Sequence, residues 1–328
     1  MMSDLARFMQ ARQWMKSNEN FLVTWHAHVG YTMHLFDAFK SKRTVRDAAA
    51  TYFLDEELLQ CWVDVGLEIG HLKGKRDGKI RAVKSMLKYA SASSPESVGI
   101  LLREMMELHI PTLLEYPERM KSGVYRTYAG DAFGEVVAET SSLLEKAAVP
   151  AVLKCVKKHK PESVLDLGCG SGGYLSHIYE ETSGVKLQGV EINEAVAKKA
   201  ARRLNGRAEI FVGSISQFME QTKQTYSMVM AHNILYYYPP SERTHLLKEF
   251  HRVLEKKGVV TIITPLMGAA AGQTFTTAFN AFMTAHTNLY PIPVQSELIK
   301  DAKEAGLKVK QIEPLIREGG WYLITLTK

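Results

Sequence analysis

The segment VLDLGCGSGGY, residues 164–174, places four glycines and one acid at the end of an apolar run. Gly168, Gly170 and Gly173 fit the spacing G-x-G-x-x-G. Glycines let a ligand approach the backbone, and the N-terminus of a following helix offers free N–H groups. Glu191 ends the next apolar run, where a carboxylate can accept hydrogen bonds from both hydroxyls of a ribose. The spacing predicts a site for a cofactor that contains a nucleoside.

Asp166 indicates which cofactor these residues favour. It lies two positions before the first glycine, at the end of the apolar run. A carboxylate repels a pyrophosphate, which argues against NAD, but it attracts a cationic amino acid group. S-adenosylmethionine carries an ammonium, a sulfonium and a ribose but no phosphate. Acids at the ends of both apolar runs therefore favour S-adenosylmethionine.

With LDLGCGSGG and GVEIN, the chain resembles the class I S-adenosylmethionine-dependent methyltransferases over residues 163–328. Many family members carry an Asp after the third strand, for the amino group of adenine. This chain has Ser214 there, so Ser214 or the backbone of Ile215 is expected to make that contact. The other contacts that the resemblance implies are Asp166 for the cofactor amino group, Gly168 and Gly170 for the methionine moiety, Glu191 for the ribose and Ile192 for adenine.

A second segment, AHNILYYYPPSER at residues 231–243, follows an apolar run and contains the candidate catalytic residues. In the O-methyltransferases that the chain resembles, a His a few residues past the fourth strand is the general base. Tyr236 stands at that position, and an unperturbed Tyr pKa of about 10 makes a poor base at neutral pH. A Tyr can still donate a hydrogen bond to the acceptor. His232 lies four residues earlier and is predicted either as a base from a shifted position or as a core histidine.

The acceptor atom is left open by these residues. O-methylation of a small molecule is the main prediction, because the resembled O-methyltransferases of secondary metabolism share the same domain order. The missing His leaves N-methylation as an alternative, and also C-methylation of an α-keto acid. In the latter, His232 and His286 would hold a metal that acts as a Lewis acid. Tyr125, Arg126 and His286 are predicted as substrate contacts.

The pattern after residue 163 predicts an α/β fold with a Rossmann-like methyltransferase sheet. Apolar runs alternate there with amphipathic segments, which is typical of parallel strands covered by helices. The short connection IREGG predicts that the last two strands pair as a hairpin, so the final strand is antiparallel. The expected strands are residues 163–168, 186–192, 208–213, 226–232, 258–266, 307–315 and 321–328.

The first 122 residues are predicted to be mostly helical and to form a domain of their own, with 123–328 as the cofactor-binding domain. Thr44 is a good N-cap, and Asp77-Gly78 is a strong hairpin signal. Helix, helix and hairpin follow the winged-helix order. Such a domain resembles the dimerisation and substrate-lid domain of small-molecule O-methyltransferases, which implies a homodimer. The rival hypothesis is a winged-helix regulator that retains the cofactor fold without catalysis.

The composition of the chain argues against nucleic acids and membranes as binding partners. The 328 residues are 46% hydrophobic with a net charge of +6, and no Lys/Arg tract is dense enough to predict nucleic-acid binding. No apolar segment reaches the roughly 18 residues of a membrane span. Three cysteines, Cys61, Cys155 and Cys169, lack CxxC spacing, which argues against a disulfide framework. The first residues carry charges throughout and do not read as a signal peptide. We therefore expect a cytoplasmic protein without nucleic-acid or membrane partners.

Overall fold

The computed structural model describes residues 2–128 and 130–328, which divide into two compact units. One unit comprises residues 1–111 and 131–140, and the other comprises residues 112–130 and 141–328. Among the described residues, no helix is both long and apolar enough to cross a membrane.

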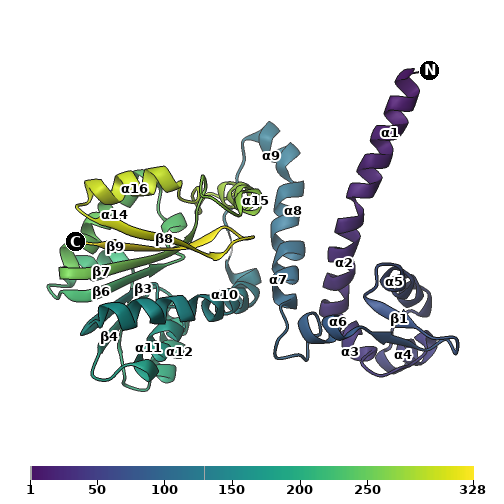
Figure 1. The fold of residues 1–328 in the computed structure, drawn as a ribbon, viewed down its shortest axis with the longest axis horizontal. Helices are drawn as coiled ribbons and strands as arrows, with labels where there is room; N and C mark the ends of the chain where they lie inside the picture. The colour runs from purple at the N-terminus through teal and green to yellow at the C-terminus, as the bar shows by residue number, and fades with distance from the viewer. Residues whose placement is uncertain (1, 129) are drawn as a thin grey trace. The chain divides into compact units, whose positions relative to one another are not determined.

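The C-terminal unit is built on a seven-stranded sheet with the strand order β5-β4-β3-β6-β7-β9-β8 (Figure 1). The pairs from β5 to β7 are parallel, and β9 is antiparallel to both of its neighbours. The predicted α/β fold, with its antiparallel last strand, is confirmed. The strands are β3 (Ser163–Leu167), β4 (Lys186–Glu191), β5 (Glu209–Val212), β6 (Tyr226–His232), β7 (Leu254–Pro265), β8 (Lys308–Ile316) and β9 (Trp321–Thr327).

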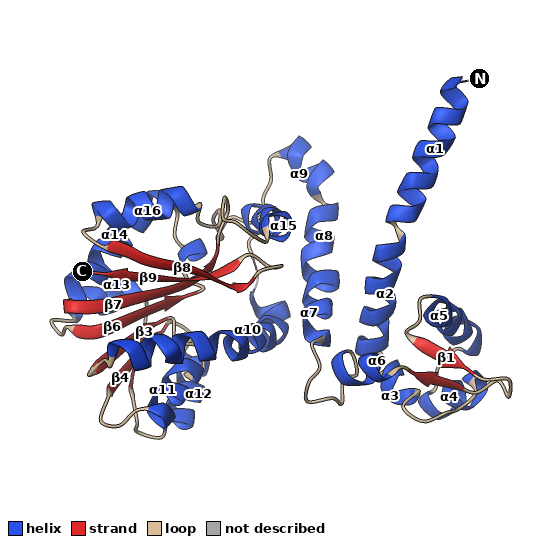
Figure 2. Cartoon of the chain, in the orientation of Figure 1, coloured by secondary structure: helices blue, strands red, loops and turns tan. Residues whose placement is uncertain are grey.

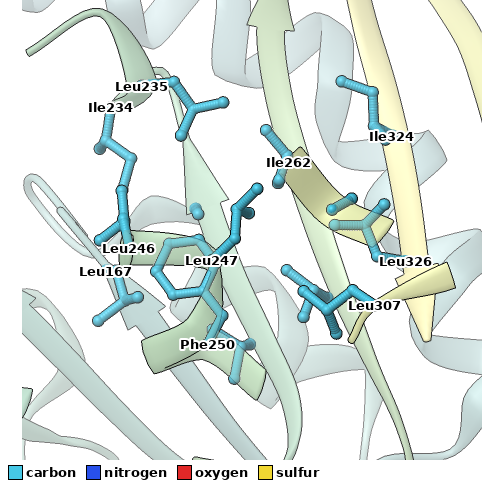
Figure 3. Packing of buried hydrophobic residues seen from close by; sticks show 14 of the residues in the cluster. Leu167, Ile234, Leu235, Leu246, Leu247, Phe250, Ile262, Leu307, Ile324 and Leu326 are labelled. Atoms are coloured by element: carbon cyan, nitrogen blue, oxygen red, sulfur yellow. The ribbon is translucent and has the colours of Figure 1, made fainter. Parts of the chain in front are cut away.

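Helices cover both faces of this sheet (Figure 2). Consecutive residues of a strand point to opposite faces, so Leu165 packs in one hydrophobic cluster and Val164 in the other. The first cluster includes Leu246 and Phe250 of α14, as Figure 3 shows. The helices are α10 (Gly130–His159), α11 (Gly173–Glu181), α12 (Glu194–Leu204), α13 (Ile215–Gln221), the 3-10 helix η2 (Leu235–Tyr237), α14 (Pro240–Val253), α15 (Gln273–Thr284) and α16 (Gln295–Glu304), preceded by α8 (Ile110–Leu114) and α9 (Tyr116–Ser122).

The strand order explains where a ligand can bind. From β3 the chain proceeds outward to β4 and β5, and then returns to place β6 on the other side of β3. In open parallel sheets, a crevice for ligands forms at such a switch point, beyond the carboxyl ends of the strands. Asp166, Glu191 and His232 all lie at or near the carboxyl ends of β3, β4 and β6. The fold thus brings the sequence-predicted residues to one edge of the sheet.

The N-terminal unit is helical, with one small hairpin. Its elements are α1 (Met2–Ser17), α2 (Glu19–Thr32), α3 (Leu35–Ala38), α4 (Val45–Tyr52), α5 (Glu56–Glu68), β1 (Leu72–Gly74), β2 (Ile80–Ala82), α6 (Lys84–Tyr89), α7 (Gly99–Glu104) and the π-helix η1 (Met105–His109). Thr44 caps α4 by accepting a 3.1 Å hydrogen bond from Asp47 N, as its position predicts. Gly78 adopts a φ of 72° in the turn between β1 and β2. Phe36, Trp62 and other apolar side chains form the core.

Candidate functional site

The glycine loop between β3 and α11 presents its backbone. Gly168, Gly170 and Gly172 adopt φ values of 75°, 54° and 76°, the left-handed region that glycine enters without strain. The N–H groups of Gly168 and Cys169 both donate to Val190 O at 2.9 Å, which fixes the loop to β4. A Cβ on Gly170 would meet no atom within 4 Å. The loop is therefore held to β4 by two hydrogen bonds and is open to a ligand at Gly170.

Glu191 is brought to the glycine loop, as the sequence predicts. Its Oε2 accepts a 3.0 Å hydrogen bond from Gly170 N, and its Oε1 accepts one of 2.9 Å from Asn193 N. Ile192 follows with 72% of its surface exposed, which suits a side chain that covers a flat ligand. Ser214 begins α13, and its Oγ accepts a bond from Gln217 N at 3.1 Å. The Ser214 hydroxyl therefore caps the helix with one lone pair, which leaves its hydrogen and its second lone pair for a ligand, and Ile215 follows it in the chain.

Asp166 is the most unusual acid of the unit. Only 1% of its surface is exposed, and its Oδ2 has no hydrogen-bond partner among the described residues. Burial, and then the charges of Glu145 and Glu191, raise the pKa of Asp166 to about 8. A buried acceptor without a partner calls for a donor or a cation. The ammonium group of S-adenosylmethionine has that chemistry, so the residues present fit this cofactor.

Sequence reasoning missed Glu145, which lies on α10 and is partly buried. A Cβ on Gly173 would overlap the Glu145 carboxylate, so this acid lies against the first turn of α11. Burial raises the pKa of Glu145, and the charges of Arg203 and His177 act in the opposite direction. Within a helical pattern, Glu145 reads as an ordinary solvated residue. Gly173, the third glycine of the G-x-G-x-x-G spacing, makes room for Glu145, but the motif does not indicate which residue fills that space.

His232 lies inside the unit. Its Nε2 is 3.1 Å from Thr261 Oγ1, while its Nδ1 has no partner among the described residues. The ring packs edge-on against Tyr174, with 4.6 Å between the centroids. Burial lowers the pKa of His232 to about 3, so the imidazole is neutral at pH 7 and holds a proton weakly. The Tyr174 hydroxyl is likewise unpartnered within the described chain, and burial raises its pKa.

Tyr236 is buried in η2 beside an aromatic row that sequence reasoning also missed. Its ring meets Phe279 edge-on, with 6.3 Å between the centroids. Phe275, Phe279 and Phe282 recur at helical spacing along α15, and Trp321 lies 5.5 Å from Phe279. The alternation of phenylalanines in TFTTAFNAF was the available signal. These rings give the region around Tyr236 an apolar wall.

The three predicted substrate contacts lie together but differ in exposure. Arg126 pairs with His286 through an isolated backbone bridge, and its guanidinium forms a 2.9 Å ion pair with Glu115. Tyr125 is 56% exposed. His286 is buried, and its Nδ1 donates to Phe282 O at 2.9 Å, while burial lowers its pKa.

The structure does not add a ligand to the metal site that His232 and His286 were predicted to form. Within the described residues, no group of three or more His, Cys, Asp or Glu side chains is arranged to hold a metal ion. Thr261 and Tyr174 surround His232, whereas Phe282 and Tyr128 surround His286. The pairing of His232 and His286 on a metal stays a prediction.

A cleft of about 550 Å³ lies between α13 and α14. It includes Ile215, but neither the glycine loop nor Tyr236. Its remaining lining is Ser216, Met219, Glu220, Thr222, Lys223, Tyr238, Glu242, His245, Leu246, Glu249 and Arg252. The site is therefore defined by the unpartnered polar atoms and the glycine loop, and not by this cleft.

The segment that contains the glycine loop is similar to a known protein family. Residues 164–258 match the family model described as a methyltransferase domain. The chain contains a methyltransferase domain. The matched segment runs from β3 into β7, so it includes the glycine loop, Glu191 and Tyr236.

Solved structures extend the likeness of this methyltransferase to the whole chain. An O-methyltransferase family protein from Burkholderia thailandensis has a TM-score of 0.78 at 17% identity, with 100% of this chain and 98% of that chain covered. Human N-acetylserotonin methyltransferase, solved with S-adenosylmethionine, gives 0.77 at 15%, covering 97% of each chain. The N,N-8-amino-8-demethyl-D-riboflavin dimethyltransferase of Streptomyces davawensis gives 0.73 at 16%, covering 97% and 98%. The predicted fold, that of the O-methyltransferases with an N-terminal helical domain, is confirmed.

A curated relative adds a weaker match. An uncharacterized protein from Haemophilus influenzae is 25% identical over 136 residues, which is 40% of this chain and 52% of that protein. The chain thus matches about half of the length of this relative.

Proposed function

We propose that this protein transfers a methyl group from S-adenosylmethionine to a small-molecule acceptor. The observation that carries the proposal is Asp166, a buried acid with an unpartnered oxygen beside an accessible glycine loop. When bound, the cofactor supplies an electrophilic methyl group on a sulfonium, and S-adenosylhomocysteine is the product. The residues of this chain bind and orient the two reactants.

Each predicted cofactor residue receives a role that fits its surroundings. Gly168 and Gly170 form the backbone under the methionine moiety, and Asp166 binds its ammonium. Glu191 already holds the loop through Gly170 N and binds the ribose hydroxyls. The exposed side chain of Ile192 covers adenine. Ser214 and the backbone of Ile215 contact the amino edge of that ring.

For the acceptor we propose an oxygen nucleophile positioned by Tyr236. The buried His232 is a weak base, because its pKa is lowered to about 3. Catalysis then rests on alignment of the acceptor with the methyl group, with Tyr236 as a hydrogen-bond donor. We assign the contacts with the acceptor molecule to Tyr125, Arg126 and His286. N-methylation stays as an alternative, since the fold also occurs in a dimethyltransferase whose name indicates a nitrogen acceptor. Metal-assisted C-methylation is the other alternative.

We further propose that the winged-helix domain, residues 1–122, makes a homodimer. Large apolar side chains on α1 are exposed, among them Leu5, Phe8 and Trp14 at 63%, 60% and 70%. Exposed apolar surface of this extent is typical of an interface. A double variant, Phe8→Glu with Trp14→Glu, should sediment as a monomer. If the variant still sediments as a dimer, α1 is not part of the interface. The three free cysteines fit a reducing compartment, which supports a cytoplasmic location.

Calorimetry with S-adenosylhomocysteine tests the cofactor proposal. Gly170→Asp places a side chain at a Cβ position that has no other atom within 4 Å, so we expect the fold to be kept. The new carboxylate would fill the space proposed for the cofactor, so we expect binding to be lost. Gly184→Asp is a matched control, because Gly184 also has a left-handed φ of 76° and no atom near its Cβ position. Equal binding by both variants, or no binding by the parent protein, would refute the proposed cofactor site.

A further inference from the structure

Glu145 has surroundings that its place in the sequence does not suggest. It lies on α10, and its carboxylate takes up the volume that a side chain on Gly173 would need. Gly173 has no left-handed φ, so its backbone conformation alone does not demand glycine. The third glycine of the G-x-G-x-x-G spacing therefore makes room for an acid from another helix.

Arg203 and His177 act on the charge of Glu145 from nearby, but neither pairs with its carboxylate. No nitrogen of a Lys, Arg or His in the described residues forms an ion pair with Glu145, and Arg203 instead donates to Ser171 Oγ at 3.2 Å. The charge of Glu145 acts on Asp166 and on Tyr174. Asp166 Oδ2 and the Tyr174 hydroxyl are both buried, and neither has a hydrogen-bond partner among the described groups. The Glu145 carboxylate thus lies at the start of α11, one residue before Tyr174, and its charge is felt by Asp166 at the end of β3.

We propose that Glu145 is a cofactor-binding residue and that its carboxylate, together with Asp166, binds the α-ammonium group of S-adenosylmethionine. The proposal rests on the function proposed above. An ammonium offers three donors, and two carboxylates with one hydroxyl supply matching acceptors. A charge-assisted hydrogen bond in a buried site is stronger than a neutral one, so each acid should contribute to affinity.

The competing role for Glu145 is purely structural. A carboxylate at the N-terminus of α11 interacts favourably with the helix dipole. In that case the loss of Glu145 lowers the stability of the protein and weakens all cofactor analogues alike. An ammonium-binding role differs, because it affects only the analogues that carry the amino group.

Calorimetry on Glu145→Gln separates the two roles. The probes are S-adenosylhomocysteine, decarboxylated S-adenosylmethionine, which keeps the amino group, and 5′-methylthioadenosine, which lacks it. We expect affinity for the first two to fall roughly 10- to 100-fold, while affinity for 5′-methylthioadenosine stays within twofold. Glu180→Gln, an exposed acid on α11, is the control and should bind all three like the parent.

Each alternative outcome has a defined meaning. Unchanged affinity for the amino-containing probes, or an equal loss for all three, overturns the role of Glu145. If the parent protein binds none of the probes, the proposed function fails instead. Should Glu145→Gln not fold, Glu145→Asp provides the same comparison, because it keeps the charge and withdraws it by one methylene. The same pattern of selective loss is then expected, and its absence counts against the proposal.

Discussion

Replacing Asp166 by Asn should make the protein more stable and at the same time unable to hold its cofactor. Asp166 is buried, and its pKa is raised from 3.8 to about 8. Between these two values the folded state binds one proton more than the unfolded state. Stability is therefore complete below pH 3.8 and declines as the pH rises towards 8. The acid costs stability at neutral pH, and Asn, which has the same shape and no charge, removes this cost.

The size of the effect follows from the shift. The range from pH 3.8 to pH 7 covers about three pH units, and over each unit the free energy of unfolding falls by at most about 1.36 kcal/mol. The ionisable Asp166 therefore costs at most about 4 kcal/mol of stability at pH 7. The amide of Asn also lacks a ready partner for its N–H groups, and this lowers the gain to roughly 1–3 kcal/mol. For a unit of this size, each kcal/mol raises the Tm by about 2–4 °C.

Thermal unfolding from pH 5 to pH 9, without ligand, is the assay. The parent should lose stability relative to Asp166→Asn between pH 5 and about pH 8, and the difference between the two should narrow, without vanishing, as the pH falls to 5. Titration with S-adenosylhomocysteine should show at least about a 100-fold loss of affinity in the variant, if an ion pair between Asp166 and an ammonium is broken. A variant that is less stable than the parent at pH 8, or that binds equally well, would refute the reasoning. Glu180→Gln again serves as the control.

Two further predictions concern other parts of the chain. Tyr236→Phe should leave the affinity for S-adenosylhomocysteine unchanged and lower kcat by about 10-fold, because the variant loses the proposed hydrogen bond to the acceptor; a full kcat would mean that Tyr236 does not position the acceptor through its hydroxyl. In the N-terminal unit, His26 donates from Nε2 to Trp62 O, and its Nδ1 lies 3.0 Å from His71 Nδ1. Burial lowers the pKa of His26 from 6.5 to about 4, so this unit should lose stability as the pH falls from 6.5 to 4. Fluorescence of Trp62, which stacks on His26 at 4.1 Å between the centroids, reports the change, and a signal that is flat down to pH 4 would contradict it.

The sequence alone sufficed for features that depend on neighbours in the chain. The buried parallel strands are continuous apolar runs, the glycine loop joins one strand to the next helix, and Asp77-Gly78 forms a turn by itself. Glu191 is also local in this sense, because the end of the second strand of a parallel unit must lie beside the first loop. These features appear in the structure close to where the pattern placed them.

Tertiary structure decided the features that depend on burial and on distant partners. Nothing near Glu145 in the sequence reveals that helix packing directs its carboxylate to Gly173. Likewise, Trp321 donates its indole N–H to Asn233 Oδ1 at 3.0 Å, across 88 residues of chain. The sequence left His232 open as a base, a metal ligand or a core histidine, and only the fold shows that it is removed from water and that its pKa is lowered. Residue type and spacing specify which chemistry is available, but desolvation and opposing charge, which set the protonation state, arise only when separate segments pack together.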